Sequence, residues 1–181
     1  IKNARNLIMC VIVDTNCLAS VFECKSENHP QFAPVLEWII SGKGKLIYGG
    51  SKYISELRKA SKYFNIINQL KKKGKVICVD KERVDREQKR IEKEITDKDF
   101  DDPHLPAIVI VSKCKVICSC DTRSVKFVTL PQLYPKGIDV PKYYTSKRNI
   151  DLLSDKYVHD CYKPLNKCNK SDQESLVKLL V

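Results

Sequence analysis

The amino-acid sequence predicts an α/β fold with three layers, α/β/α, built on a mainly parallel central sheet. Four short apolar runs are separated by longer segments of helical periodicity, and this alternation is typical of parallel strands joined by crossover helices. The runs are continuously apolar, as in strands that helices cover on both faces. With 181 residues, 43% of them hydrophobic, the chain can bury one substantial core.

The expected strands are the apolar run at 7–13 and three similar runs at 45–50, 75–80 and 115–121. The expected helices lie between these runs, at 32–42, 51–74, 81–95 and 103–113. Gly42 and Gly74 are expected to close the first two helices, and Ser51 to cap the second, because these residue types favour helix ends.

The segment 81–95 is so rich in charge that only Val84, Ile91 and Ile95 can face a core, which places this helix at the periphery. Residues 1–150 are expected to form one domain. Residues 151–181 are a C-terminal extension, too short for a second domain, whose last residues are expected to form a helix that docks on the domain or on a second protomer.

The cysteine count favours a reducing compartment, the cytoplasm. Nine cysteines, an odd number, are spread over a chain of ordinary core-forming composition, unlike a small disulfide-stapled secreted domain. Those in apolar segments are expected to be core side chains: Cys10, Cys17, Cys78 and Cys118. The paired two-residue spacing of a zinc knuckle is missing, so a zinc site is not expected. No apolar run approaches the roughly 18 residues that cross a bilayer, so no membrane association is expected.

The charge balance predicts a polyanionic partner, most simply nucleic acid. The chain has 33 Lys and Arg against 22 Asp and Glu, a formal charge of +11. Aromatic and basic residues alternate over 142–148, where Lys142, Lys147 and Arg148 are expected to hold phosphates while tyrosines stack on bases. The open alternatives are a lysine-rich surface that only confers solubility and an ordinary edge strand at this segment.

Four carboxylates are expected to gather at one edge of the sheet. Asp14 follows the first strand, Asp121 follows the last apolar run, and Asp102 opens the helix that leads into that run. Glu56 lies a little over one turn into the helix at 51–74. Because sites in open α/β sheets lie outside the carboxyl ends of the strands, these side chains should share one cleft.

Such a cluster implies a bound cation, because carboxylates without a counter-ion raise one another's pKa values. Mg²⁺ or Mn²⁺ fits best, since hard cations take oxygen ligands and the sequence has neither a His/Cys set for zinc nor a calcium-loop pattern. A metal of this kind supplies hydroxide and neutralises charge on a phosphate, which is the chemistry of phosphodiester hydrolysis. The alternative roles are helix capping for Asp14, Asp102 and Asp121, which is compatible with metal binding, and a solvated helix position for Glu56.

The same residues resemble the motifs of PIN-domain nucleases. The matching segments are Asp-Thr-Asn at 14–16 after an apolar strand, the helical Glu56, the Asp-Pro run from Asp102, and Ser-Cys-Asp at 119–121. The order of these segments and the intervals between them agree with the family from about residue 8 to residue 130.

The resemblance implies a PIN-like α/β/α nuclease domain over 1–150 that cleaves single-stranded or structured RNA with Mg²⁺ or Mn²⁺. The residues that match the family's metal-binding, catalytic cluster are Asp14, Glu56, Asp102 and Asp121. Asn16 and Ser119 match positions that support this cluster by hydrogen bonds, and 142–153 resembles the last strand and the turn after it. The family includes toxins of toxin–antitoxin pairs and RNA-processing enzymes, so an inhibitor protein or a processing complex is an expected partner beside RNA.

Arg123 departs from the family pattern, because many members carry a further acid two residues after the one matched by Asp121. A guanidinium there can pair with a carboxylate or grip a substrate phosphate. Asp101, next to Asp102, is expected to be a spare carboxylate. Two other functions stay open: a catalytically degenerate PIN-like module that binds RNA or protein, and a deoxyribonuclease.

Overall fold

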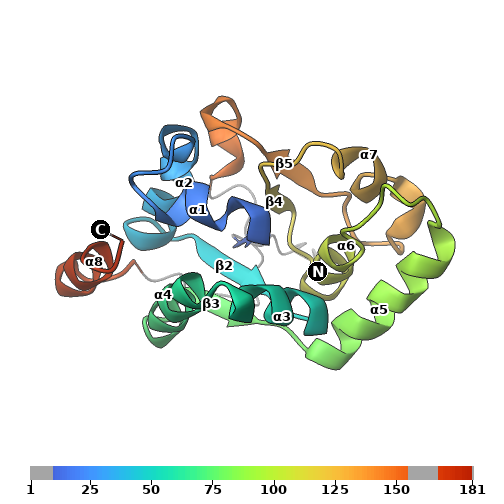
Figure 1. The fold of residues 1–181 in the computed structure, drawn as a ribbon, viewed down its shortest axis with the longest axis horizontal. Coiled ribbons are helices and arrows are strands. Elements are labelled where there is room, and N and C mark those ends of the chain that lie inside the picture. The colour runs from blue at the N-terminus through green and yellow to red at the C-terminus, as the bar shows by residue number, and fades with distance from the viewer. Residues whose placement is uncertain (1–9, 155–166, 181) are drawn as a thin grey trace, which may run out of the picture.

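A five-stranded, all-parallel sheet forms the centre of the molecule. Figure 1 shows the computed structural model, which describes residues 10–154 and 167–180. Neighbouring strands follow the spatial order β3-β2-β1-β4-β5. Their bounds are β1 (Cys10–Val13), β2 (Lys45–Tyr48), β3 (Val76–Cys78), β4 (Val116–Cys118) and β5 (Lys142–Tyr144). The four predicted apolar strands and the final strand are confirmed, although residues 7–9 lie outside the described residues.

Helices flank this sheet in the three-layer α/β/α arrangement that the alternation predicted. The α-helices are α1 (Leu18–Phe22), α2 (His29–Ile40), α3 (Ser51–Lys59), α4 (Ser61–Lys72), α5 (Lys81–Glu94), α6 (His104–Ser112), α7 (Val125–Val128) and α8 (Lys170–Val177). The short 3-10 helices are η1 (Thr15–Cys17), η2 (Pro131–Leu133) and η3 (Lys147–Leu152). In Figure 1, α1 and α2 lie at the upper left, α3 and α4 lie below β2, and α5, α6 and α7 lie at the right. Within 10–154 and 167–180, no helix is both long enough and apolar enough to span a membrane.

The central strand β1 lies at the middle of the core, and each of its four residues is at most 1% exposed. Ile12 is paired with Ile47 of β2 on one side and with Ile117 of β4 on the other. Because these strands are parallel, their carboxyl ends reach the same edge of the sheet. The residues that follow β1 and β4 are therefore neighbours there.

The segment 51–74 forms two helices, so the prediction of one continuous helix is wrong. The chain breaks at Ala60, whose φ of −99° and ψ of 65° lie outside the helical region. Leu57 before the break and Ile67 after it are both fully buried. A change of direction at Ala60 therefore allows both helices to pack their apolar sides on the core, which a single straight helix would not do.

Helix α5 lies at the periphery, as its charge pattern predicted, and the structure shows that it packs against α6. Val84 and Ile91 are fully buried, and Ile95 is partly buried against the core. Asp85 on the same helix accepts hydrogen bonds from the N–H of Ser51 at 2.7 Å and from its hydroxyl at 2.6 Å. The predicted Ser51 cap is wrong, because Ser51 is the first residue of α3 and its N–H is satisfied by Asp85.

The C-terminal helix α8 packs against α4 of the same chain. Asp172 pairs with Lys73, and Leu176 is 2% exposed. Of the two predicted docking places for this helix, the structure shows the domain itself. A homodimer stays a prediction.

Candidate functional site

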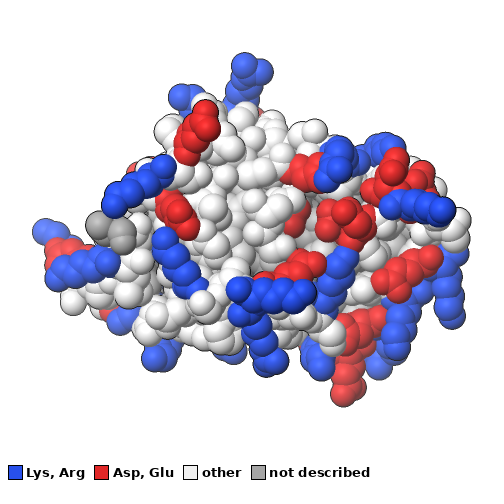
Figure 2. Space-filling view, viewed as in Figure 1, with Lys and Arg blue, Asp and Glu red and all other residues white. Residues whose placement is uncertain are grey.

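The carboxyl edge of the sheet carries a pocket of about 480 Å³, called the acidic pocket below. The residues that line it are Asp14, Thr15, Asn16, Glu56, Asp101, Asp102, Cys120, Asp121 and Arg123. In Figure 2, acidic side chains gather in the region between α3, α6 and α7, with Lys and Arg side chains at its border. The fold therefore brings all four predicted carboxylates to one pocket.

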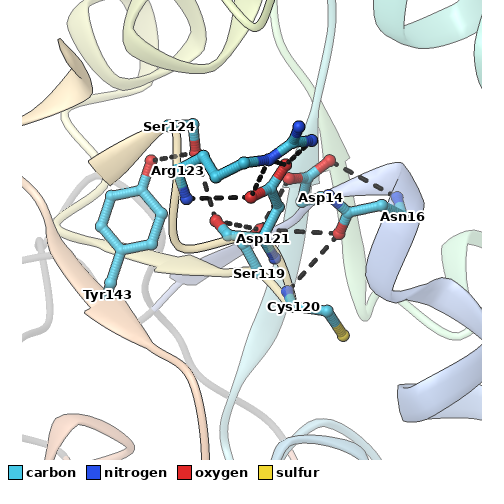
Figure 3. Close-up of polar contacts among 8 residues, drawn as sticks. All are labelled: Asp14, Asn16, Ser119, Cys120, Asp121, Arg123, Ser124 and Tyr143. Carbon is cyan, nitrogen blue, oxygen red and sulfur yellow. Dashed lines mark hydrogen bonds and ion pairs between the residues drawn. The ribbon is translucent and has the colours of Figure 1, made fainter. Parts of the chain in front are cut away.

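Asp14 lies at the end of β1 and is 2% exposed. Its N–H donates to the carbonyl oxygen of Cys118 at 2.8 Å, which continues the ladder between β1 and β4. One carboxylate oxygen accepts a hydrogen bond from the Ser119 hydroxyl at 2.8 Å, and the other accepts one from the N–H of Asn16 at 3.5 Å (Figure 3). Burial raises the pKa of Asp14, and these two hydrogen bonds oppose the rise. Asp14 thus caps η1 and lines the acidic pocket at the same time.

Ser119 and Asn16 connect the two loops that carry the carboxylates. The Ser119 hydroxyl donates to Asp14 and accepts from the N–H of Asp121 at 3.0 Å. The side-chain oxygen of Asn16 accepts from the N–H of Cys120 at 3.4 Å (Figure 3). Ser119 is completely buried, so its single hydroxyl proton is committed to this network. Both residues hydrogen-bond to Asp14, Ser119 through its hydroxyl and Asn16 through its backbone N–H.

Glu56 projects from α3, and its carboxylate accepts a hydrogen bond from the Thr15 hydroxyl at 2.7 Å. The sequence prediction missed Thr15, although a hydroxyl directly after Asp14 was a usable signal. His104 Nε2 lies 3.9 Å from the same Glu56 oxygen, and neither ring nitrogen has a hydrogen-bond partner among the described residues. Burial, followed by the charge of Lys52, lowers the pKa of His104 to about 3. The imidazole is therefore neutral and packs behind the pocket.

Asp102 lies in the turn before α6, and the pKa of its carboxyl group is strongly raised. Burial and then the charge of Asp14 raise the pKa of Asp102 to about 7, while Lys52 opposes the rise. Asp102 does not cap α6, because the N-cap is Pro103 and no side chain caps the helix. Asp101 is exposed, and its carbonyl oxygen accepts from the Lys52 ammonium group. Lys52 was also missed, although it lies one helical turn before Glu56.

Asp121 is paired with Arg123 in a fork-shaped contact at the mouth of the pocket. Arg123 Nε lies 3.0 Å from each carboxylate oxygen, and Nη2 lies 2.6 Å from Oδ2 (Figure 3). The N–H of Arg123 also donates to Asp121 at 2.8 Å. These hydrogen bonds hold the pKa of Asp121 below its usual range. Asp121 does not cap α7, because that helix has Ser124 as its N-cap.

The acidic pocket offers the donor chemistry of a site for a hard divalent cation, because its donors are carboxylate oxygens. Burial raises the pKa values of Asp14 and Asp102, and neighbouring carboxylates add to the rise. Among the described residues, however, no three acidic, His or Cys side chains are already close enough together to hold a metal ion. A cation would therefore need these carboxylates to draw closer.

The predicted phosphate-binding residues of the segment 142–148 do not line the acidic pocket. Lys142 is paired with Val116 at the amino end of the parallel strands, so it lies at the opposite end of the sheet from the carboxylates. Lys147 and Arg148 are exposed in η3, beyond the carboxyl end of β5. Aromatic and basic spacing shows which residues alternate, but not at which end of a strand they lie, and phosphate binding by these three residues stays a prediction.

A second pocket, of about 590 Å³ and called the flanking pocket below, adjoins the acidic one. The residues that line it are Lys98, Asp99, Asp101, Thr122, Arg123 and Lys126. Asp101 and Arg123 line both pockets. Lys98 and Lys126 were missed, because the loop after α5 and helix α7, which carry them, are brought together only by the fold.

Asp102→Asn is expected to stabilise the folded protein at alkaline pH in the absence of divalent cations. The wild-type carboxyl keeps its proton up to about pH 7 in the folded state but loses it near pH 4 when unfolded. Between these values the folded state binds more protons, so wild-type stability falls as the pH rises. Because Asp102 is only partly buried, we expect a gain of about 1–2 kcal/mol at pH 8.

Urea unfolding from pH 4 to pH 8 measures this difference. The variant and the wild type should converge near pH 4. Asp139→Asn is the control, because Asp139 is exposed and pairs with Lys115 away from the pocket. A gain that is equal at all pH values would contradict the prediction.

Comparison of the chain with family models, with curated proteins and with solved structures returned no match.

Proposed function

We propose that the protein is a metal-dependent endoribonuclease of the PIN type, which hydrolyses phosphodiester bonds in single-stranded or structured RNA. The observation that carries this proposal is the acidic pocket, in which four carboxylates from separate segments meet at the carboxyl edge of a parallel sheet. The raised pKa values of Asp14 and Asp102 support it, because such acids gain most from a bound cation.

The residues proposed to hold Mg²⁺ or Mn²⁺ are Asp14, Glu56, Asp102 and Asp121. Once bound, the metal lowers the pKa of a water molecule and neutralises charge on the phosphate. The protein's own contribution is orientation. Ser119 and Asn16 hold the two oxygens of Asp14, and Thr15 holds one oxygen of Glu56. These bonds fix which carboxylate oxygens remain directed at the pocket.

The positively charged side chains of the flanking pocket are proposed to contact the RNA backbone next to the cleaved phosphate. Lys98, Lys126 and Arg123 line it, and Arg123 also borders the acidic pocket. Lys and Arg side chains hold a phosphate backbone without reading its bases, which suits a nuclease of broad sequence range. We place this activity in the cytoplasm, with an inhibitor protein, a processing complex or a homodimer as proposed assemblies.

Cleavage of matched RNA and DNA oligonucleotides by the purified protein tests the proposal. With Mg²⁺ or Mn²⁺ we expect the RNA to be cut and the DNA to remain intact, and EDTA should stop the reaction. Preferential cutting of DNA would replace the proposal with the deoxyribonuclease alternative. If both substrates remain intact with either metal, the nuclease proposal fails.

A catalytically degenerate PIN-like module is the second candidate, and one contact favours it. Arg123 already neutralises Asp121, so one carboxylate of the pocket has a cation supplied by the protein itself. Such a module would bind RNA equally well with EDTA and after Asp14→Asn, without turnover. Gel-shift and cleavage assays on the same samples separate the two candidates.

A further inference from the structure

Two thiols lie in contact at the wall of the acidic pocket. The Sγ atoms of Cys17 and Cys120 are 2.9 Å apart, although these residues are separated by 103 positions in the chain. Cys17 ends η1 after β1, and Cys120 lies in the loop after β4. A disulfide bond has a length of about 2.0 Å, so the two sulfur atoms need to approach by less than about 1 Å.

The two thiols differ in their exposure to solvent. Cys120 is exposed and lines the acidic pocket, whereas Cys17 is completely buried. Cys118 is also completely buried, and its Sγ lies farther from Cys17, at 3.8 Å. A small oxidant in solvent therefore meets Cys120 first, and Cys17 is the thiol placed to react next.

We propose that Cys17 and Cys120 form a reversible oxidation site, at which a peroxide converts the two thiols to a disulfide. The Cys120 sulfur attacks one oxygen of hydrogen peroxide, the O–O bond breaks, and a sulfenic acid and one water molecule result. The Cys17 sulfur then attacks the Cys120 sulfur, the S–O bond breaks, and a second water molecule leaves. Two thiols thus lose two electrons and two protons, and one peroxide becomes two water molecules.

The disulfide would tie together the two loops that carry Asp14 and Asp121. Cys17 directly follows Asn16, and the N–H of Cys120 already donates to the Asn16 side chain. The new bond closes a loop of about 100 residues, which restricts the unfolded chain and stabilises the folded one. We expect the thermal midpoint to rise by about 5–10 °C on oxidation. The disulfide would form whether or not the acidic pocket hydrolyses RNA.

Peptide mapping of the full chain tests the site. Reduced protein is treated with hydrogen peroxide at pH 8.5, free thiols are alkylated, and the digest is analysed by mass spectrometry. We expect a linked pair of peptides that contains Cys17 and Cys120, that is lost on treatment with dithiothreitol, and that is absent from Cys120→Ser. Cys24→Ser is the matched control, because Cys24 is also exposed and should leave both the link and the thermal shift unchanged.

Cys120→Ser changes an exposed side chain, so its fold should be retained, and circular dichroism checks this. Alkylation of both Cys17 and Cys120 after peroxide treatment would overturn the proposal. A link from Cys17 to Cys118 in place of Cys120 would overturn it as well.

Discussion

Asp14→Asn is expected to reduce Mg²⁺-dependent cleavage of single-stranded RNA by more than about 100-fold. Mutating a residue that only positions a metal ligand typically lowers metal affinity or activity by about 10- to 100-fold, and Asp14 is a proposed ligand itself. Asp14 is the most buried of the four carboxylates in the acidic pocket, at 2% exposure, and both of its oxygens are held by hydrogen bonds. Asparagine keeps the shape of the side chain but removes its negative charge. The loss should therefore fall on cation binding and catalysis rather than on folding.

Initial rates of oligonucleotide cleavage over a Mg²⁺ series measure the effect, with circular dichroism and thermal unfolding as checks on the fold. The thermal midpoint should stay the same or rise, because the variant no longer buries a charge whose pKa is raised. Asp139→Asn, which removes an exposed carboxylate outside the pocket, should cleave at the wild-type rate. Undiminished cleavage by Asp14→Asn would falsify the proposed role of the acidic pocket.

Arg123→Ala is expected to lower the Mg²⁺ concentration for half-maximal cleavage by about tenfold. In the wild type a cation must displace the Arg123 guanidinium, which contacts both oxygens of Asp121. Without this arginine the carboxylate is free for the metal. The KM for RNA should rise at the same time, because Arg123 also borders the flanking pocket.

A Mg²⁺ titration at saturating RNA and an RNA titration at saturating Mg²⁺ separate these two effects. Arg123→Lys keeps the charge but not the fork-shaped contact, so its Mg²⁺ requirement should be intermediate. Arg86→Ala removes an exposed arginine of α5 that lines neither pocket and should resemble the wild type. An increased Mg²⁺ requirement in Arg123→Ala would mean that the guanidinium supports the metal-bound state instead of competing with it.

The sequence predicted the acidic pocket well because its carboxylates follow recognisable elements. Asp14 and Asp121 come after continuous apolar runs, and the ends of parallel strands meet at one edge of a sheet. Asn16 and Ser119 were found because they stand beside these acids in the chain. Thr15 and Lys52 could have been found by the same local reasoning, from the residue after Asp14 and from helical spacing to Glu56.

Other contacts could not be read from local patterns. The separation of Lys142 from the acidic pocket depends on its pairing with Val116, which is a matter of strand register. For Arg123 the sequence left two roles open, pairing with a carboxylate or gripping a phosphate, and the side-chain rotamers of one exposed loop decide for the pairing with Asp121.

By itself the sequence determined the α/β class, the strands and the carboxylates at their ends, because hydrophobic periodicity and strand-end position are local properties of the chain. The tertiary structure decided that the helical segment 51–74 breaks at Ala60, that the Arg123 guanidinium pairs with the Asp121 carboxylate, and that the thiols of Cys17 and Cys120 are in contact. The thiol contact joins residues 103 positions apart, and the break at Ala60 and the rotamer of Arg123 depend on how the surrounding segments pack, which no local pattern records.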